Sequence, residues 1–287
     1  MRIVSLLPAA TDIVYALHRD EDLVGVTFEC APRARASKTV VVGGRATAGM
    51  TPAAIDGYVR AQLAAGADLY TLHRSALHAL APDVILTQDL CRVCAVGSGQ
   101  LADALDYLGC SAEVVSLDPH RLPEVIAGIA TVAERIGADA GPLLRRLHAR
   151  LAAVQARVAG RPRPRAAVVE WVDPPFPGGH WIPDLVSAAG GDPVAAMPGA
   201  RSAPVPWSHF EAADVVLVAP CGFGLDGAIE QAAVVARQLP GRAVWALDAD
   251  ALVVRPGPAL IDGVEAIASI LHPDQVSVPP GRTARVA

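Results

Sequence analysis

The strongest constraint on the fold is an alternation of short apolar runs with helical segments. In the first part of the chain, β-branched and leucine-rich runs predict strands at residues 2–6, 23–27, 39–42, 84–87 and 114–117. The alternation returns with predicted strands at residues 166–172, 215–219 and 243–247. Strands joined through helices favour parallel sheets covered on both faces, so the predicted class is α/β.

A long amphipathic segment separates the two sets of strands. From residue 123 to about 157, apolar side chains recur at spacings of three and four, with a break only near residues 137–142. About 30 helical residues at ~1.5 Å each would reach across two small lobes. The predicted architecture is two Rossmann-like βα lobes joined by one long backbone helix, with lobes at 1–121 and 161–287 and the helix at 122–160. The residues from Pro279 onward are predicted to be a disordered tail.

Charge and the first residues limit the partners and the location. The 287 residues have a formal net charge of −5, and Lys and Arg do not cluster with aromatic residues, so nucleic acid is not an expected partner. Pro, Gly or charge interrupts each apolar stretch before it could span a bilayer. Met1 leads directly into a strand without the features of a signal peptide, which predicts a cytoplasmic protein.

Cysteines are placed where ligands bind in open α/β sheets. Four of the five follow the carboxyl ends of predicted strands: Cys30, Cys91, Cys94 and Cys221. An odd number of cysteines fits reduced thiols or metal ligands better than a disulfide framework. A Cys-x-x-Cys pair with two further thiolates supplies a tetrahedral set for zinc, or the ligands of an iron–sulfur cluster. Buried unreactive thiols and a redox Cys-x-x-Cys are the alternatives.

Other side chains in the same loops are candidates for binding or catalysis. Glu29 is a candidate metal ligand, proton acceptor or solvated carboxylate. His180 follows two glycines that allow a close backbone approach, and its imidazole can coordinate a metal, shuttle protons or bond a neighbouring carbonyl. The candidate ligand contacts are Trp181, Trp207, Phe223 and Arg255. The aromatic residues fit a flat wall or lobe packing, and the arginine fits an anionic group or a surface ion pair.

Several motifs carry a family resemblance that covers nearly the whole chain. They are Arg2-Ile3-Val4-Ser5-Leu6-Leu7-Pro8, Thr87-Gln88-Asp89-Leu90-Cys91-Arg92-Val93-Cys94-Ala95-Val96, Gly179-His180-Trp181-Ile182-Pro183 and Ala219-Pro220-Cys221-Gly222-Phe223. With the long helix, they resemble the cobalamin-binding-protein subgroup of the class III substrate-binding proteins of ABC importers for cobalamin, haem and iron chelates. The resemblance implies a class III periplasmic-binding-protein-like fold and a cleft between two lobes. The implied ligand is cobalamin, another corrinoid or tetrapyrrole, or an iron complex.

Two functions therefore follow from the sequence. The first is binding of a small metal-containing or metal-chelated ligand. Docking on an ABC permease is doubtful in this interpretation, because Ser75 and Ser208 align where importer-associated relatives commonly carry glutamates. The alternative is a cytosolic metalloenzyme that uses a Cys-ligated metal or iron–sulfur cluster, with Glu29 or His180 as the acid or base.

Overall fold

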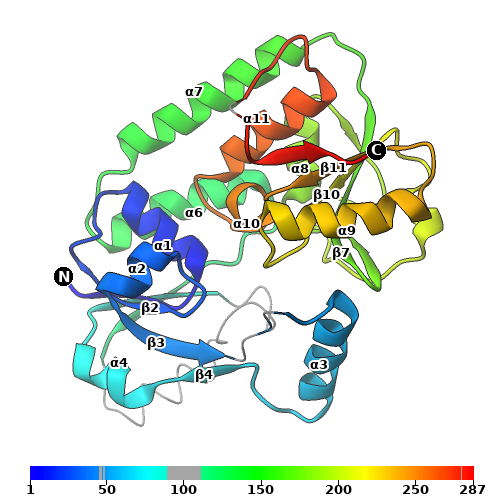
Figure 1. Ribbon diagram of the computed structural model, residues 1–287. Helices are drawn as coiled ribbons and strands as arrows, with labels where there is room; N and C mark the ends of the chain where they lie inside the picture. Colours follow the sequence, from blue (N-terminus) through cyan, green and yellow to red (C-terminus); the bar gives the residue numbers. More distant parts are fainter. Residues whose placement is uncertain (45–46, 48, 89–110, 279) are drawn as a thin grey trace. The chain divides into compact units, whose positions relative to one another are not determined.

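The predicted parallel α/β architecture is confirmed in a computed structural model that describes residues 1–44, 47, 49–88, 111–278 and 280–287 (Figure 1). The chain divides into two units. Unit 1 consists of Met1–Asp118 and Ile126–Leu144, and unit 2 consists of Pro119–Val125 and Arg145–Ala287. Each unit contains one mixed sheet in which most neighbouring strands are parallel.

The sheet of unit 1 has the order β4-β3-β2-β1-β5-β6, with only β4 antiparallel among these strands. Its strands are β1 (Ile3–Ser5), β2 (Leu23–Thr27), β3 (Thr39–Gly44), β4 (Tyr70–Leu72), β5 (Val84–Thr87) and β6 (Glu113–Ser116). The helices between them are α1 (Pro8–Ala16), α2 (Pro32–Ser37), α3 (Pro52–Ala64) and α4 (Arg74–Leu80). A proline begins α1, α2 and α3, where its missing N–H costs nothing. Thr51 caps the amino end of α3, since its Oγ1 accepts the Ala54 N–H at 3.3 Å.

The predicted break in the long amphipathic segment is also confirmed. It separates α6 (Leu122–Arg135) from α7 (Gly141–Val158). Gly137 lies in the break with a φ of 62°, a left-handed conformation that suits glycine. The beginning of α6 belongs to unit 2 and its remainder to unit 1, whereas α7 begins in unit 1 and ends in unit 2.

The sheet of unit 2 has the order β12-β11-β10-β7-β8, and β9 pairs with β7. Its strands are β7 (Arg165–Val172), β8 (Pro175–Pro177), β9 (Asp192–Pro193), β10 (Val215–Val218), β11 (Ala243–Leu247) and β12 (Thr283–Arg285). The helices are α8 (Ile182–Ala188), α9 (Leu225–Gln238), α10 (Ala249–Leu252) and α11 (Leu260–Leu271), with a short 3-10 helix at Trp207–Phe210. Helix α9 packs on β10 and β11, and α8 and α10 pack on α11. The parallel strands β7, β10 and β11 bring the carboxyl-end loops of unit 2 to one edge of its sheet.

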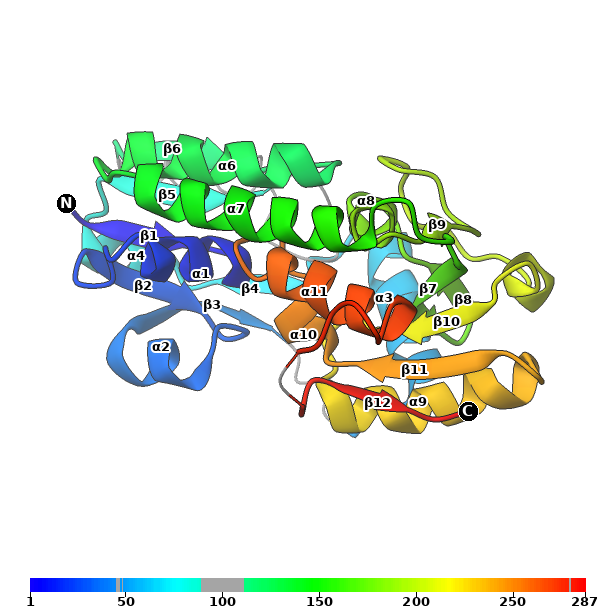
Figure 2. The ribbon, with the colours of Figure 1, turned by 90° about the horizontal axis from the view of Figure 1, so that it is seen from above.

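The end of the chain corrects one prediction. The residues after Pro279 were expected to be disordered, but β12 pairs antiparallel with β11, with Ala284 opposite Ala246 (Figure 2). An edge strand of three residues is stabilised by its neighbour's hydrogen bonds and needs no apolar pattern of its own.

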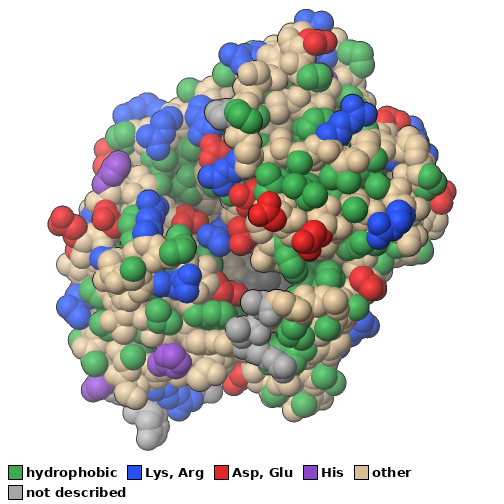
Figure 3. All heavy atoms as spheres, viewed as in Figure 1, with side chains coloured by type: hydrophobic (Ala, Val, Ile, Leu, Met, Phe, Trp, Pro, Cys, Tyr) green, Lys and Arg blue, Asp and Glu red, His purple; other side chains and the backbone are tan. Residues whose placement is uncertain are grey.

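Among the described helices, none combines the length and the apolar character that crossing a membrane requires. Basic and acidic side chains are interspersed over the face shown in Figure 3, with hydrophobic side chains between them.

Candidate functional site

Cys30 is placed in unit 1 as a buried thiol. It follows β2, is only 2% exposed, and its Sγ lies 3.2 Å from Thr11 Oγ1. Thr11 donates its hydroxyl to Ser5 Oγ at 2.9 Å, and Ser5 donates to the Leu7 carbonyl at 2.8 Å. Cys30 therefore belongs to a small buried polar cluster with Thr11 and Ser5.

Glu29 lies beside aromatic residues that the sequence did not single out. Tyr70 Oη is 3.5 Å from Glu29 Oε1, and the rings of Phe28 and Tyr70 are 6.2 Å apart. A Cβ added at Gly44 would lie 2.6 Å from the Phe28 ring, so a larger residue there would displace this ring. The paired Gly43-Gly44 at the end of β3 was the available signal for this close approach. Unit 1 thus presents a carboxylate and two aromatic rings at the carboxyl ends of β2 and β3.

The predicted cysteine metal set is not supported. Cys91 and Cys94 lie outside the described residues. Cys30 is buried in unit 1, and Cys221 is exposed in unit 2. Across the described parts of the chain, no three His, Cys, Asp or Glu side chains form a group that could hold a metal ion.

His180 is held in an unusual backbone conformation between β8 and α8. Its φ is 51°, and its N–H donates to the Ala200 carbonyl at 2.7 Å while its carbonyl accepts the Gly199 N–H at 2.9 Å. A Cβ at Gly179 would lie 2.6 Å from Ser202 N, which explains the glycine before His180. The buried Gly179 also donates its N–H to Glu170 Oε2 at 3.1 Å. The predicted close approach around these glycines is therefore made by the protein's own segment at residues 199–202.

The imidazole of His180 lies in a partly desolvated environment. Burial, followed by the charges of His120 and Arg201, holds the pKa of His180 below its ordinary value. Its Nε2 is buried and has no hydrogen-bond partner among the described residues. Burying a polar atom without a partner costs about 1–3 kcal/mol, so this atom calls for an explanation.

His120, which the sequence left unassigned, lies next to His180 with a centroid separation of 5.5 Å between the rings. Its position depends on the following residue: Arg121 binds Asp184 in the first turn of α8 through two bonds of 2.8 Å. Asp184 also accepts the Leu122 N–H at 3.0 Å. No sequence pattern signals this contact, because the two histidines come from separate segments that a salt bridge joins.

The predicted ligand contacts of unit 2 have different surroundings. Trp181 is 6% exposed and donates its Nε1–H to the Val253 carbonyl at 2.8 Å. Trp207 packs on the core and lies 5.7 Å from the Phe210 ring, centroid to centroid. Both tryptophans therefore contribute to packing within the unit.

Phe223 and Cys221 lie at the carboxyl end of β10, beside the end of β7. The Phe223 ring is 6.0 Å from that of Trp171, and both side chains are partly exposed. Cys221 donates its N–H to the Glu170 carbonyl at 3.1 Å, which fixes this loop to β7. Arg255 is partly buried and forms a long ion pair of 3.4 Å with Asp250. Trp171, Phe223 and Cys221 thus form a partly apolar surface at the sheet edge.

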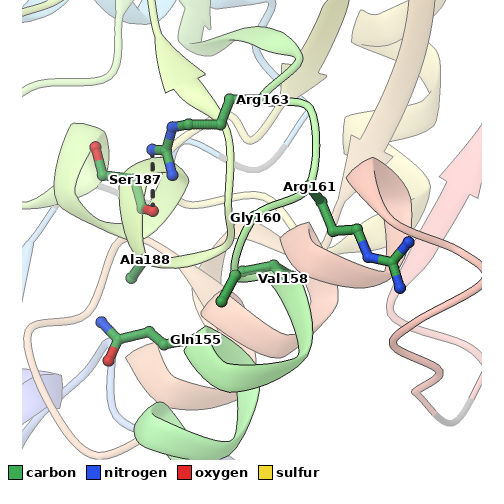
Figure 4. Close-up of a pocket in the computed structure, with 8 residues that line it drawn as sticks. Gln155, Val158, Gly160, Arg161, Arg163, Ser187 and Ala188 are labelled. Carbon is green, nitrogen blue, oxygen red and sulfur yellow. Dashed lines mark hydrogen bonds between the residues drawn. The ribbon is translucent and has the colours of Figure 1, made fainter.

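A pocket of about 350 Å³ lies elsewhere in unit 2, where α7 and α8 end (Figure 4). Arg163 reaches across it and donates to the Ser187 carbonyl at 3.3 Å and to Asp192 at 2.7 Å. Arg161 lies on the other side and binds Gln275. The pocket adjoins the segment that enters β7 at Arg165, so it lies at the amino end of this strand, away from the loops described above.

Comparisons with known proteins give a consistent fold. No family model matches the sequence, and no curated protein matches it. The periplasmic haem-binding protein RhuT from Roseiflexus sp. RS-1 is 19% identical, with a TM-score of 0.67 over 95% of this chain and 98% of its own. The periplasmic vitamin B12-binding protein BtuF of Vibrio cholerae is 21% identical, with a TM-score of 0.63 over 96% and 97%. An ABC transporter substrate-binding protein from Listeria monocytogenes EGD-e is 18% identical, with a TM-score of 0.65 over 95% and 98%.

These structures correct the prediction about location. The first residues predicted a cytoplasmic protein, but the haem- and vitamin B12-binding proteins of this fold are periplasmic, and this finding contradicts the prediction. The doubt about an ABC permease as a partner receives no support from them. The family resemblance of the motifs is confirmed at the level of structure: the chain has the two-lobed α/β fold of the class III periplasmic binding proteins.

Proposed function

We propose that this protein binds a small metal-containing or metal-chelated ligand, with cobalamin or another corrinoid as the first candidate and haem or an iron chelate as the next. The observation that carries the proposal is the shared fold with haem- and vitamin B12-binding proteins over nearly the full length of both chains. An ABC permease is the corresponding protein partner.

The side chains at the carboxyl ends of the strands support a ligand of this kind. In unit 2, Trp171 and Phe223 offer partly exposed rings to a large planar or macrocyclic ligand. Unit 1, taken by itself, presents the rings of Phe28 and Tyr70 beside the carboxylate of Glu29. Aromatic faces with few polar groups suit a corrin or porphyrin, whose framework is broad and mostly apolar.

The alternative of a Cys-ligated metalloenzyme gains no support. Its predicted ligands Cys30 and Cys221 belong to different units and lie in unlike surroundings. The solved structures of this fold named above are binding proteins.

Titration of the untagged protein with cyanocobalamin, hydroxocobalamin and haemin tests the proposal, read by ligand absorbance and tryptophan fluorescence. Removing one ring that contacts the ligand, as in Trp171→Ala or Phe223→Ala, should weaken binding about tenfold, which corresponds to about 1.4 kcal/mol. Trp245→Phe is the matched control, because Trp245 lies within β11 and pairs with Arg285 of β12. Failure to bind any of these ligands, or equal affinities for all variants, would contradict the proposal.

A further inference from the structure

The histidine pair of unit 2 has a feature that packing leaves unexplained. Two imidazoles from separate segments meet at a centroid distance of 5.5 Å, and the buried Nε2 of His180 has no hydrogen-bond partner in the described parts of the structure. Buried polar atoms nearly always have a partner, either in the protein or in a bound water or ion. An atom that accepts a bond from no neighbour is available to a metal ion.

The spacing of the rings fits one shared ion. An ion bound at about 2.1 Å from an imidazole nitrogen lies about 3.2 Å from the centre of that ring. Two such rings at a tetrahedral angle have centres about 5.2 Å apart, whereas a right angle brings them to about 4.5 Å. The observed 5.5 Å is close to the tetrahedral value.

The hydrogen bond of His120 also favours metal binding through its Nε2. Its Nδ1 lies 3.3 Å from the Gly199 carbonyl, and donation there leaves the Nε2 lone pair free. Metal-binding histidines commonly donate their second ring nitrogen to a backbone carbonyl, which fixes the tautomer and the ring orientation. The same residue, Gly199, donates its N–H to the His180 carbonyl, so both histidines are tied to one segment.

We propose that His120 and His180 bind one divalent transition-metal ion through their Nε2 atoms, with water completing the coordination. Imidazole ligands favour Ni²⁺, Cu²⁺ and Zn²⁺ over Mg²⁺ and Ca²⁺. Two protein ligands make this a site for a hydrated ion of moderate affinity. The proposal rests on the two histidines and does not depend on binding of a corrinoid or haem.

The nearby positive charge provides an internal check. Arg201 is exposed, and its charge acts on His180. A guanidinium repels a bound cation, so Arg201→Ala should strengthen metal binding by about two- to fivefold, since solvent screens an exposed charge. A packing role for the two histidines gives no reason for a gain of affinity in this variant.

The experiment is a calorimetric titration of the untagged full chain with Ni²⁺ after removal of metals with a chelator. A Cys91→Ser, Cys94→Ser, Cys110→Ser, Cys221→Ser background removes competing thiols other than the buried Cys30. His180→Asn is preferred to alanine, because asparagine tolerates the left-handed backbone, and His120→Gln preserves the size of the second side chain. His148→Ala is the control, since His148 is exposed on α7.

Each single histidine variant should lose at least tenfold in Ni²⁺ affinity, and the control should retain wild-type affinity. The Cu²⁺ form should show superhyperfine coupling to two nitrogens in its electron paramagnetic resonance spectrum, and coupling to one nitrogen in either variant. Circular dichroism in chelator verifies that the variants are folded. Absence of Ni²⁺ binding, or a loss confined to one of the two histidine variants, would overturn the proposal, whatever the outcome of the corrinoid titration.

Discussion

Glu170 joins the two loops of unit 2 that carry His180 and Cys221, and its removal should disturb one of them selectively. Its carboxylate accepts the Gly179 N–H at 3.1 Å, whereas its backbone carbonyl accepts the Cys221 N–H at 3.1 Å. Only the first bond depends on the side chain. Glu170→Ala therefore removes an acceptor from a buried N–H next to His180 and leaves the second bond in place.

The expected loss of stability follows from this bond. A hydrogen bond to a charged group contributes about 1.5–3 kcal/mol, so Glu170→Ala should lower the free energy of unfolding of unit 2 by about 2 kcal/mol. In a unit of this size, that corresponds to a Tm about 4–8 °C lower. Glu170→Gln keeps an oxygen acceptor of similar reach without the charge, and it should lose about half as much.

Thermal unfolding followed by circular dichroism measures the loss, with Glu230→Ala as the control because Glu230 is an exposed carboxylate on α9. Histidine NMR supplies a second measurement. Burial lowers the pKa of His180, so a loosened Gly179-His180 segment should let that pKa rise toward its ordinary value. The Tm changes by ~2–4 °C per kcal/mol in a unit of this size. The reasoning would be refuted if Glu170→Ala had a Tm within about 1 °C of wild type and an unchanged His180 pKa.

Three further changes test the packing and charges of unit 2. Gly263→Ala places a Cβ 2.0 Å from the Leu252 carbonyl oxygen, so α11 must move away from α10. Urea unfolding should show a free energy of unfolding lower by about 3 kcal/mol, and a wild-type midpoint would contradict this packing. Trp181→Phe removes a buried donor and should cost about 1–2 kcal/mol by the same measurement, while an unchanged midpoint would mean that the bond contributes nothing. Hydrogen bonds from Arg165 lower the pKa of Asp214 to about 2. The stability that this ion pair contributes is therefore present above pH 3.8 and is lost as the pH falls toward 2. Asp214→Asn should reduce this acid sensitivity by at most about 1 kcal/mol because the pair is exposed, and identical acid-unfolding curves would argue against it.

The parallel core of both sheets could be predicted because such strands are buried on both faces. Val84–Thr87 and Val215–Val218 are continuous apolar or β-branched runs, and each is a strand at the predicted position. The strands missing from the prediction are edge segments of another kind. Pro175–Pro177 and Thr283–Arg285 lack an apolar alternation and are strands because a neighbour supplies their hydrogen bonds. Their pairing depends on tertiary structure, which a local pattern does not record.

The candidate site could also be predicted only in part from the sequence. The glycines before His180 marked a close approach that the structure contains, although the approaching group is the segment at residues 199–202. No sequence pattern indicated that His120 lies next to His180, because its position depends on the ion pair of Arg121 with Asp184. Trp181 illustrates a further limit, because an aromatic residue beside a glycine pair fits a ligand wall and a buried packing residue equally. The hydrogen bond from Trp181 to the Val253 carbonyl could not be predicted from the local sequence.

The conformation and burial of His180 carry two local costs to the stability of unit 2. Its positive φ costs about 1–3 kcal/mol for a residue other than glycine, and its unpartnered buried Nε2 costs about 1–3 kcal/mol more. Asparagine tolerates this backbone better and is smaller. His180→Asn is therefore expected to unfold at the wild-type urea midpoint or above it, although it loses Ni²⁺ binding. A clear drop in the midpoint would identify His180 as a packing residue, and it would remove the reason for assigning a bound ion to its side chain.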